Sequence, residues 1–216
     1  MPAVTVKGRG VRYETIGDGF PLILVPDANG TVHDWDPAMP LFGELCRVIA
    51  YEYDQLSPPR VQPPQVPLID RVADLAALFE CLAVERAYLA GVAVGALTAL
   101  TYARHHPKRL EGSVCIGLEE PTQPPDDAGT AADAAIAVPL QGLTVPTLLV
   151  AGEQAAAQVA WATRSALQCP QARTEIITRT KTPHREQPLQ LGHIMVRFLL
   201  QCERQRNLVR GASFLL

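Results

Sequence analysis

The stretch RAYLAGVAVGALTALTYARHH, residues 86–106, contains the pattern that decides the fold. Residues 86–92 form a short apolar run of the kind found in buried strands, and from Val94 onward apolar residues recur at helical spacing. Gly91 and Gly95 lie on either side of the joint, and they permit a sharp turn whose central residue has a strained backbone. The stretch therefore predicts a strand, a tight turn and a helix.

The residue at the centre of this turn is Ala93. In the G-x-S-x-G turn of many hydrolases, the same position holds a serine that the turn presents above a helix N-terminus as a nucleophile. The methyl group of an alanine cannot attack a carbonyl carbon. The turn therefore leaves two interpretations, in which the chemistry has been lost or other residues perform it.

Composition narrows the class of protein. The chain has 216 residues, of which 48% are hydrophobic and 19% charged, and its formal net charge is -3. One medium domain of this length buries about 70% of its unfolded surface, and the weak negative charge argues against a broad nucleic-acid interface. The five cysteines are widely spaced and form no C-x-x-C pair, so we expect reduced core residues in a soluble cytoplasmic protein.

Outward from the central stretch, apolar runs alternate with amphipathic segments. The pattern predicts strands at residues 4–7, 11–15, 22–25, 47–53, 86–92, 112–118, 145–152 and 174–178, and helices at 31–45, 68–84, 94–106, 156–167 and 186–204. This rhythm indicates a doubly wound, mainly parallel sheet with an N-terminal antiparallel hairpin and helices on both faces. Ligands of such sheets bind at the carboxyl ends of the strands.

We expect one domain over residues 1–205, with a loop at residues 119–141 and a C-terminal tail at residues 206–216. The proline-rich segment 57–67 is predicted to be an extended surface stretch. The tail carries Arg206 and Arg210 before the apolar end Phe214-Leu215-Leu216. It is predicted either to pack on its own domain or to contact another subunit or a membrane surface.

The order of these segments and their residue patterns resemble the α/β-hydrolase superfamily over roughly residues 11–200. The resemblance is carried by PLILVPDANGTVHDWDPAMPLFGELCRVIAYEYDQ, DLAALFECLAVERAYLAGVAVGALTALTYARHHPKRLEGSVCIG, LTVPTLLVAGEQ and PHREQPLQLGHIMVRFL. It implies the α/β-hydrolase fold. Members with a cap insert many tens of residues where this chain has only residues 119–144, so the lid is expected to be absent or reduced.

The resemblance also implies positions for a Ser-His-Asp triad, and this chain departs from it at each one. Ala93 stands where the family has serine, and Ala155 stands where the acid is expected after the strand at 145–152. Lys181 stands where the histidine is expected. These three positions are interpreted as vestigial, so no catalytic residue is expected there.

The loop after the strand at 22–25 differs as well. The family commonly has His-Gly where this chain has Pro26-Asp27. The amides of Ala28 and Val94 are the candidates for a two-donor oxyanion hole. A carboxylate at Asp27 would oppose an oxyanion by Coulomb repulsion, and it is predicted either to occupy the hole itself, held by the helix that begins at Val94, or to be a solvated loop residue. The candidate ligand-binding residues are therefore Asp27, Ala28, Ala93 and Val94.

Asp27, His184, Glu153 and Lys181 are the fallback candidates for acid–base chemistry. His184 would need a loop shift to act as a displaced base, and its alternative is a second histidine that the family often carries in this segment. Glu153 could replace the missing acid or be an exposed loop residue, and Lys181 could pair with Asp27 across the vacant site. No cluster has metal-ligand spacing and no glycine-rich cofactor loop follows a strand, so no metal and no cofactor are expected.

The sequence thus favours a catalytically degenerate hydrolase-fold protein, a pseudoenzyme that acts as a binding or structural subunit. Its contact surfaces would be the open top of the sheet and the C-terminal tail, with a protein partner or a small-molecule ligand and without nucleic acid or a transmembrane segment. The alternative is an active hydrolase, lyase or cyclase that uses relocated acid and base residues.

Overall fold

The computed structural model describes residues 1–53, 66–120 and 140–212. Most of the predicted segment 57–67, most of the predicted loop 119–141 and the end of the tail lie outside these ranges. The described part forms one eight-stranded sheet with the strand order β1-β2-β4-β3-β5-β6-β7-β8. The strands are β1 (Ala3–Val6), β2 (Arg9–Ile16), β3 (Phe20–Val25), β4 (Cys46–Tyr53), β5 (Ala87–Val92), β6 (Leu110–Ile116), β7 (Thr147–Gly152) and β8 (Ala172–Ile177).

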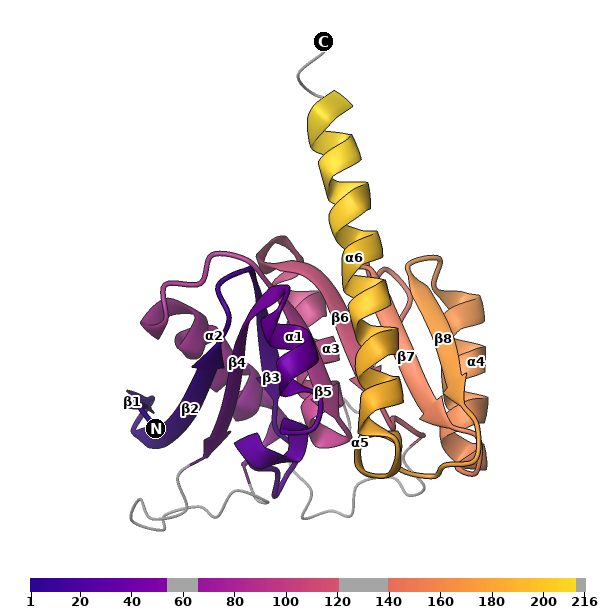
Figure 1. Cartoon of the computed structure of the whole chain (residues 1–216), viewed down its shortest axis with the longest axis horizontal. Helices are drawn as coiled ribbons and strands as arrows, with labels where there is room; N and C mark the ends of the chain where they lie inside the picture. Colours follow the sequence, from indigo (N-terminus) through magenta and orange to yellow (C-terminus); the bar gives the residue numbers. More distant parts are fainter. Residues whose placement is uncertain (54–65, 121–139, 213–216) are drawn as a thin grey trace.

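Strands β3 to β8 are parallel, and the β1–β2 hairpin joins them antiparallel through the β2–β4 pair. The predicted fold class is confirmed. Helices cover both faces, as Figure 1 shows. Helices α2 (Leu68–Cys81), α3 (Val94–His105) and α4 (Ala156–Gln168) lie on one face, and α1 (Met39–Gly43) and α6 (Pro188–Ala212) lie on the other.

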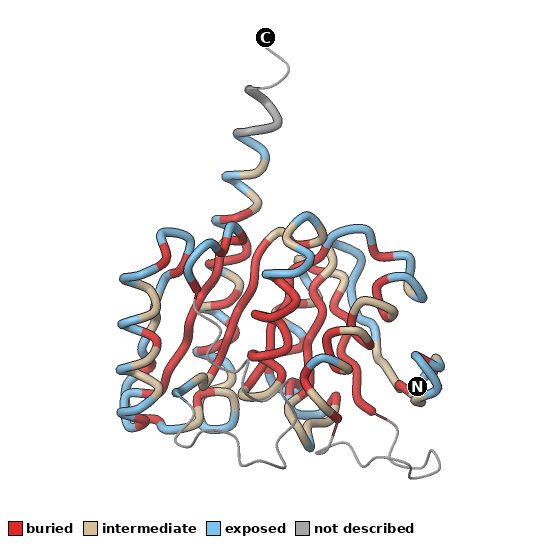
Figure 2. Tube along the Cα trace, turned by 180° about the vertical axis from the view of Figure 1, so that it is seen from behind, coloured by how far each residue is buried: buried red, intermediate tan, exposed pale blue. Residues whose placement is uncertain are grey.

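Two apolar clusters form the core, one on each face. The first joins α2, α3 and α4 to the sheet, with Leu75, Phe79 and Leu100 fully buried. The second contains Trp35, Phe42 and Met195 and holds α1 and α6 against the opposite face. Figure 2 shows that the central strands are buried along their length, because helices exclude water from both sides.

The prediction of one helix over residues 31–45 is wrong. The segment instead forms the 3₁₀ helix η1 (Val32–Trp35) and the short helix α1, with Pro37 between them and Pro40 in the first turn of α1. Proline has no N–H to donate and its ring clashes with the preceding turn, so it breaks a continuous helix. Both pieces still bury Trp35 and Phe42 in the same cluster, which explains the unbroken apolar pattern.

The last predicted helix corresponds to α6, with a short helix before it. The short helix α5 (Pro183–Glu186) comes first, and α6 then begins at Pro188, where proline suits a first helical turn. Helix α6 continues to Ala212, beyond Arg204 where the predicted helix ended. Figure 1 shows its final turns running past the sheet. None of the helices in the described ranges is long and apolar enough to span a bilayer.

Candidate functional site

The turn between β5 and α3 has the strained geometry that its glycines predict. Ala93 is the N-cap of α3 with φ 48° and ψ -113°, a region that residues other than glycine rarely adopt. The two glycines allow the strand and the helix to meet backbone to backbone, since a Cβ on Gly91 would lie 2.3 Å from the carbonyl carbon of Gly95. Position 93 is thus held above the sheet in a fixed orientation, with a methyl group as its side chain.

Asp27 lies beside this turn, at the carboxyl end of β3. Its Oδ1 accepts a hydrogen bond from the backbone N–H of Val94 at 3.2 Å. The N-terminus of a helix carries partial positive charge and unpaired N–H groups, so it favours a carboxylate at this place. One of the two amides expected to form an oxyanion hole is therefore bound to the protein's own side chain.

A cavity of about 110 Å³ opens next to Asp27. The residues that line it come from β3, the loop after it, η1, β5 and α5: Val25, Asp27, Asn29, Gly30, Asp34, Trp35, Val92, His184 and Arg185. The cavity lies at the carboxyl ends of β3 and β5, where an open parallel sheet binds its ligands. Of the four predicted ligand-binding residues, Asp27 lines the cavity. Ala28, Ala93 and Val94 do not line it, but each lies within two residues of Asp27 or Val92 in the sequence.

His184 is half-buried on the wall of this cavity. Its Nδ1 is buried and has no hydrogen-bond partner among the described residues. Burial lowers the pKa of His184 and the charge of Arg185 lowers it further, against the opposing effect of Asp34 and Asp27. The neutral imidazole is thus favoured, and it shares a cavity with the Asp27 carboxylate.

The other candidates lie outside the lining of this cavity. The Oε2 of Glu153 accepts the backbone N–H of Arg179 at 2.9 Å, so this carboxylate fixes the turn after β8. Ala155 is the buried N-cap of α4. Lys181 is exposed, and the ion pair with Asp27 is not formed in the described structure.

Glu186 orders the segment that carries Lys181 and His184. Its carboxylate accepts hydrogen bonds from the hydroxyls of Thr180 and Thr182 and from the backbone of Thr182 and Lys181. These bonds, led by the one from the Thr182 hydroxyl, lower the pKa of Glu186 to about 2. The carboxylate therefore holds the α5 turn in place and has little capacity left for a proton-transfer role.

Buried thiols offer no replacement nucleophile near the turn. Cys115 lies in β6, its Sγ is directed at the carbonyl of Ala96, and burial raises its pKa to about 12. A thiol that stays protonated at neutral pH is a poor nucleophile. Within the described ranges, no group of three or more His, Cys, Asp or Glu side chains is placed to hold a metal ion.

Seven of the residues that line the cavity were not predicted as site residues, among them Asp34, Trp35 and Arg185. Asp34 and Trp35 have the sequence signal of a helix start, and Asp34 does accept the backbone N–H of Thr31 at 3.0 Å. Arg185 follows His184 and has no motif of its own. For Asp34 and Trp35, the available signal was their position in the segment after β3, because that segment contributes to the same edge of the sheet.

Acidification is expected to destabilise the protein through His184. A histidine whose pKa is lower in the folded state binds its proton more readily when unfolded, so stability is lost as pH falls below the ordinary value of 6.5. His106, whose pKa burial also lowers, contributes with the same sign. The free energy of unfolding in urea should therefore fall from about pH 7.5 to about pH 5.5, and less so in His184→Gln.

The exposed His33 on η1 provides the control for this measurement. His33→Gln should keep the pH dependence of the wild-type protein. An unchanged pH dependence in His184→Gln would contradict the assignment of His184 as a buried neutral imidazole.

No family model matches the sequence of this chain. Its structure is similar to a carboxylesterase of the thaumarchaeon Nitrososphaera gargenis, with a TM-score of 0.78 and 16% identity over 94% of this chain and 100% of that one. It is also similar to the enol-lactonase of Burkholderia xenovorans LB400, with a TM-score of 0.72 and 16% identity over 92% of this chain and 100% of that one.

A third similar structure is the meta-cleavage product hydrolase of Pseudomonas fluorescens IP01 in complex with acetates. Its TM-score is 0.76 and its identity 15%, over 93% of this chain and 98% of the hydrolase. These similarities are to the overall fold alone, since the sequences are too different to transfer an activity. The chain has the α/β-hydrolase fold.

Proposed function

We propose that this chain is a catalytically degenerate α/β-hydrolase-fold protein that acts as a binding or structural subunit. The observation that carries the proposal is the methyl group of Ala93 at the centre of the strained β5–α3 turn. None of the described residues that line the neighbouring cavity has a hydroxyl or a thiol. The scaffold that would present a nucleophile is retained, and the nucleophile is replaced.

The Asp27 carboxylate supports the same proposal. Acyl transfer needs hydrogen-bond donors aimed at an oxygen that becomes negative, and each such donor is worth about 10²–10³ in kcat. Here the Val94 amide already binds Asp27, and the carboxylate repels a second negative charge. This arrangement suits a stable resting structure better than it suits the hydrolysis of an ester.

The remaining triad positions agree with the loss of covalent chemistry. A triad needs a base to take the proton of the nucleophile and an acid to orient that base. Ala155 has no acid group, and Lys181 is exposed. Among the fallback residues, Asp27 and His184 alone share the cavity, so any relocated acid–base chemistry would depend on this pair.

The size and position of the cavity set its possible occupants. At about 110 Å³ it holds a ligand of a few heavy atoms or a few waters. A larger partner would contact the open top of the sheet or the C-terminal tail. Cytoplasmic location and the absence of a cofactor are parts of the same proposal.

The test is an assay for covalent and hydrolytic chemistry. Purified protein would be incubated with a fluorophosphonate probe and with short-chain p-nitrophenyl esters, alongside an active serine esterase as the positive control. We expect no labelling and no turnover above spontaneous hydrolysis. Ala93→Ser should also remain inactive, because Lys181 and Ala155 supply neither the base nor the acid.

Three variants make the assay decisive. Turnover by the wild-type protein that disappears in Asp27→Asn and in His184→Ala would overturn the proposal and assign an acid–base mechanism to the pair. Esterase activity in Ala93→Ser would equally contradict it, since a working base would then lie within reach of position 93.

A further inference from the structure

In the described part of the chain, β8 forms one outer edge of the sheet. Strand β8 is the last in the strand order and pairs with β7 on one side, and Figure 1 shows it at the margin of the sheet. None of the other described strands pairs with its second side. Ile176 on this strand is 42% exposed, a large value for an apolar residue in a sheet. An uncovered edge of this kind is a template for another strand.

The direction of the peptide groups along β8 follows from its bonds to β7. The N–H of Thr147 donates to the carbonyl of Gln171 at 2.8 Å, and the N–H of Glu153 donates to the carbonyl of Ile177 at 2.9 Å. Alternate residues of a strand direct their peptide groups to opposite sides. The odd-numbered residues therefore face β7, and the peptide groups of Ala172, Thr174 and Ile176 point outward.

We propose that two copies of this chain associate about a two-fold axis at Thr174, with β8 pairing antiparallel to its copy. The N–H of Thr174 then donates to the carbonyl of the partner's Thr174, and the N–H of Ile176 donates to the carbonyl of the partner's Ala172. The N–H of Ala172 is already bound to the carbonyl of Cys169 at 2.9 Å, so it stays within its own chain. Each bond occurs twice, because the contact is isologous.

The charged side chains of β8 favour the pairing register with the axis at Thr174. Thr174 faces α4, with its hydroxyl bound to the carbonyl of Ala162, so Arg173 and Glu175 lie on the opposite face of the sheet. An axis at Thr174 places Arg173 directly opposite the partner's Glu175, at the spacing where opposite charges stabilise a strand pair by roughly 0.2–1 kcal/mol. Moving the axis by one residue would place Arg173 or Glu175 opposite its own copy, and like charges there are destabilising.

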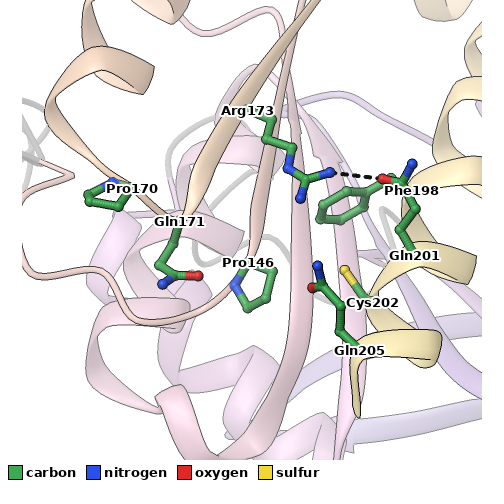
Figure 3. Close-up of a pocket in the computed structure, with 8 residues that line it drawn as sticks. All are labelled: Pro146, Pro170, Gln171, Arg173, Phe198, Gln201, Cys202 and Gln205. Carbon is green, nitrogen blue, oxygen red and sulfur yellow. Dashed lines mark hydrogen bonds between the residues drawn. The ribbon is translucent and has the colours of Figure 1, made fainter. Parts of the chain in front are cut away.

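Each of these side chains is available for such a contact. Nη1 of Arg173 donates to the amide oxygen of Gln201 on α6 at 2.9 Å, as Figure 3 shows. This partner is neutral, so a carboxylate from the second copy would add charge compensation. Glu175 forms an exposed ion pair with Arg197 at 2.6 Å, and its second oxygen is open to a further guanidinium.

The surface around β8 extends the contact beyond the strand. Two neighbouring cavities of about 110 and 250 Å³ lie between β8 and α6 and share Arg173, Phe198 and Gln201. Pairing of the two strands would bring the second copy over the open side of this groove and would place α4 beside its copy on the other face. A specific interface needs about 1,200 Å² of buried surface, which a strand pair reaches together with such flanking contacts.

The full chain tests the proposal by sedimentation equilibrium. We expect a particle of twice 23.4 kDa in the wild-type protein. Thr174→Pro removes an N–H that the β7 ladder does not use, and proline is tolerated at such an edge position, so this variant should fold and raise the dimer dissociation constant at least about tenfold. Thr174→Val loses the same hydroxyl but keeps the N–H, and it should remain dimeric.

A charge exchange tests the register independently of the proline variant. Arg173→Glu should produce monomers, because it places carboxylates opposite one another, and adding Glu175→Arg should restore the dimer. Circular dichroism and thermal unfolding would confirm that each variant is folded. The proposal fails if the wild-type protein is a monomer at about 100 μM, well above the Kd of a specific complex, or if a dimer persists in both Thr174→Pro and Arg173→Glu.

Discussion

Gly95→Ala is expected to lower the free energy of unfolding by at least about 3 kcal/mol, which is the upper end of the losses that overpacked core positions cause. A Cβ on Gly95 would lie 2.4 Å from the carbonyl oxygen of Val25 and 2.7 Å from that of Pro26. Both neighbours are backbone atoms at the end of a central strand, so neither can turn away as a side chain would. Helix propensity favours alanine over glycine by only about 1 kcal/mol. The steric clash outweighs this gain, so the free energy of unfolding should fall.

Urea unfolding monitored by circular dichroism measures this loss. Gly8→Ala is the control, since a Cβ there meets nothing within 4 Å and only its positive φ of 81° opposes the change. We expect that control to cost about 1 kcal/mol. A Gly95→Ala protein as stable as the wild-type would show that the loop after β3 can move away from α3, and Asp27 with it.

The central turn is predictable because its cause is local. The two glycines, the apolar run before them and the alanine-rich helix after them lie within one short stretch, and the close approach of Gly91 to Gly95 needs no distant partner. The mainly parallel sheet is predictable from the alternation of apolar runs with amphipathic helices, since parallel strands need helical crossovers.

The site was less predictable because its residues come from distant parts of the chain. Asp27 and His184 were separate candidates in the sequence, and the cavity that joins them forms only where α5 packs on η1. The divided helix at residues 31–45 shows the same limit. Its apolar spacing continues through Pro37, because η1 and α1 face one core cluster, so periodicity alone could not reveal the break.

Buried ionic contacts are a further feature that sequence spacing could not indicate. Arg9 lies between two glycines of a predicted hairpin, where a solvated side chain would be ordinary. In the structure its Nε and Nη2 donate to the two oxygens of Asp74 at 2.7 Å each, which ties the β1–β2 hairpin to α2. These bonds raise the pKa of Arg9.

Asp74→Asn is expected to lower the free energy of unfolding by about 3 kcal/mol, because it removes the buried carboxylate of the Arg9–Asp74 ion pair and leaves Arg9 with the more distant, exposed Asp70. The Asp74 side chain is 2% exposed. An asparagine has the same shape but no charge, so the Arg9 guanidinium would lose the carboxylate that its Nε and Nη2 contact. The midpoint of thermal unfolding should fall by roughly 10 °C for a chain of this size.

Asp70→Asn is the matched control, because Asp70 contacts the same arginine at the surface. Its Oδ2 lies 3.9 Å from Nη1 of Arg9, and its side chain is 48% exposed. Solvent screens such a pair, so we expect a loss below about 1 kcal/mol. Equal losses in the two variants would mean that the charge of Arg9, and not the burial of Asp74, determines the stability of the hairpin contact. A large loss confined to Asp74→Asn would show that the contact depends on the buried carboxylate that α2 contributes.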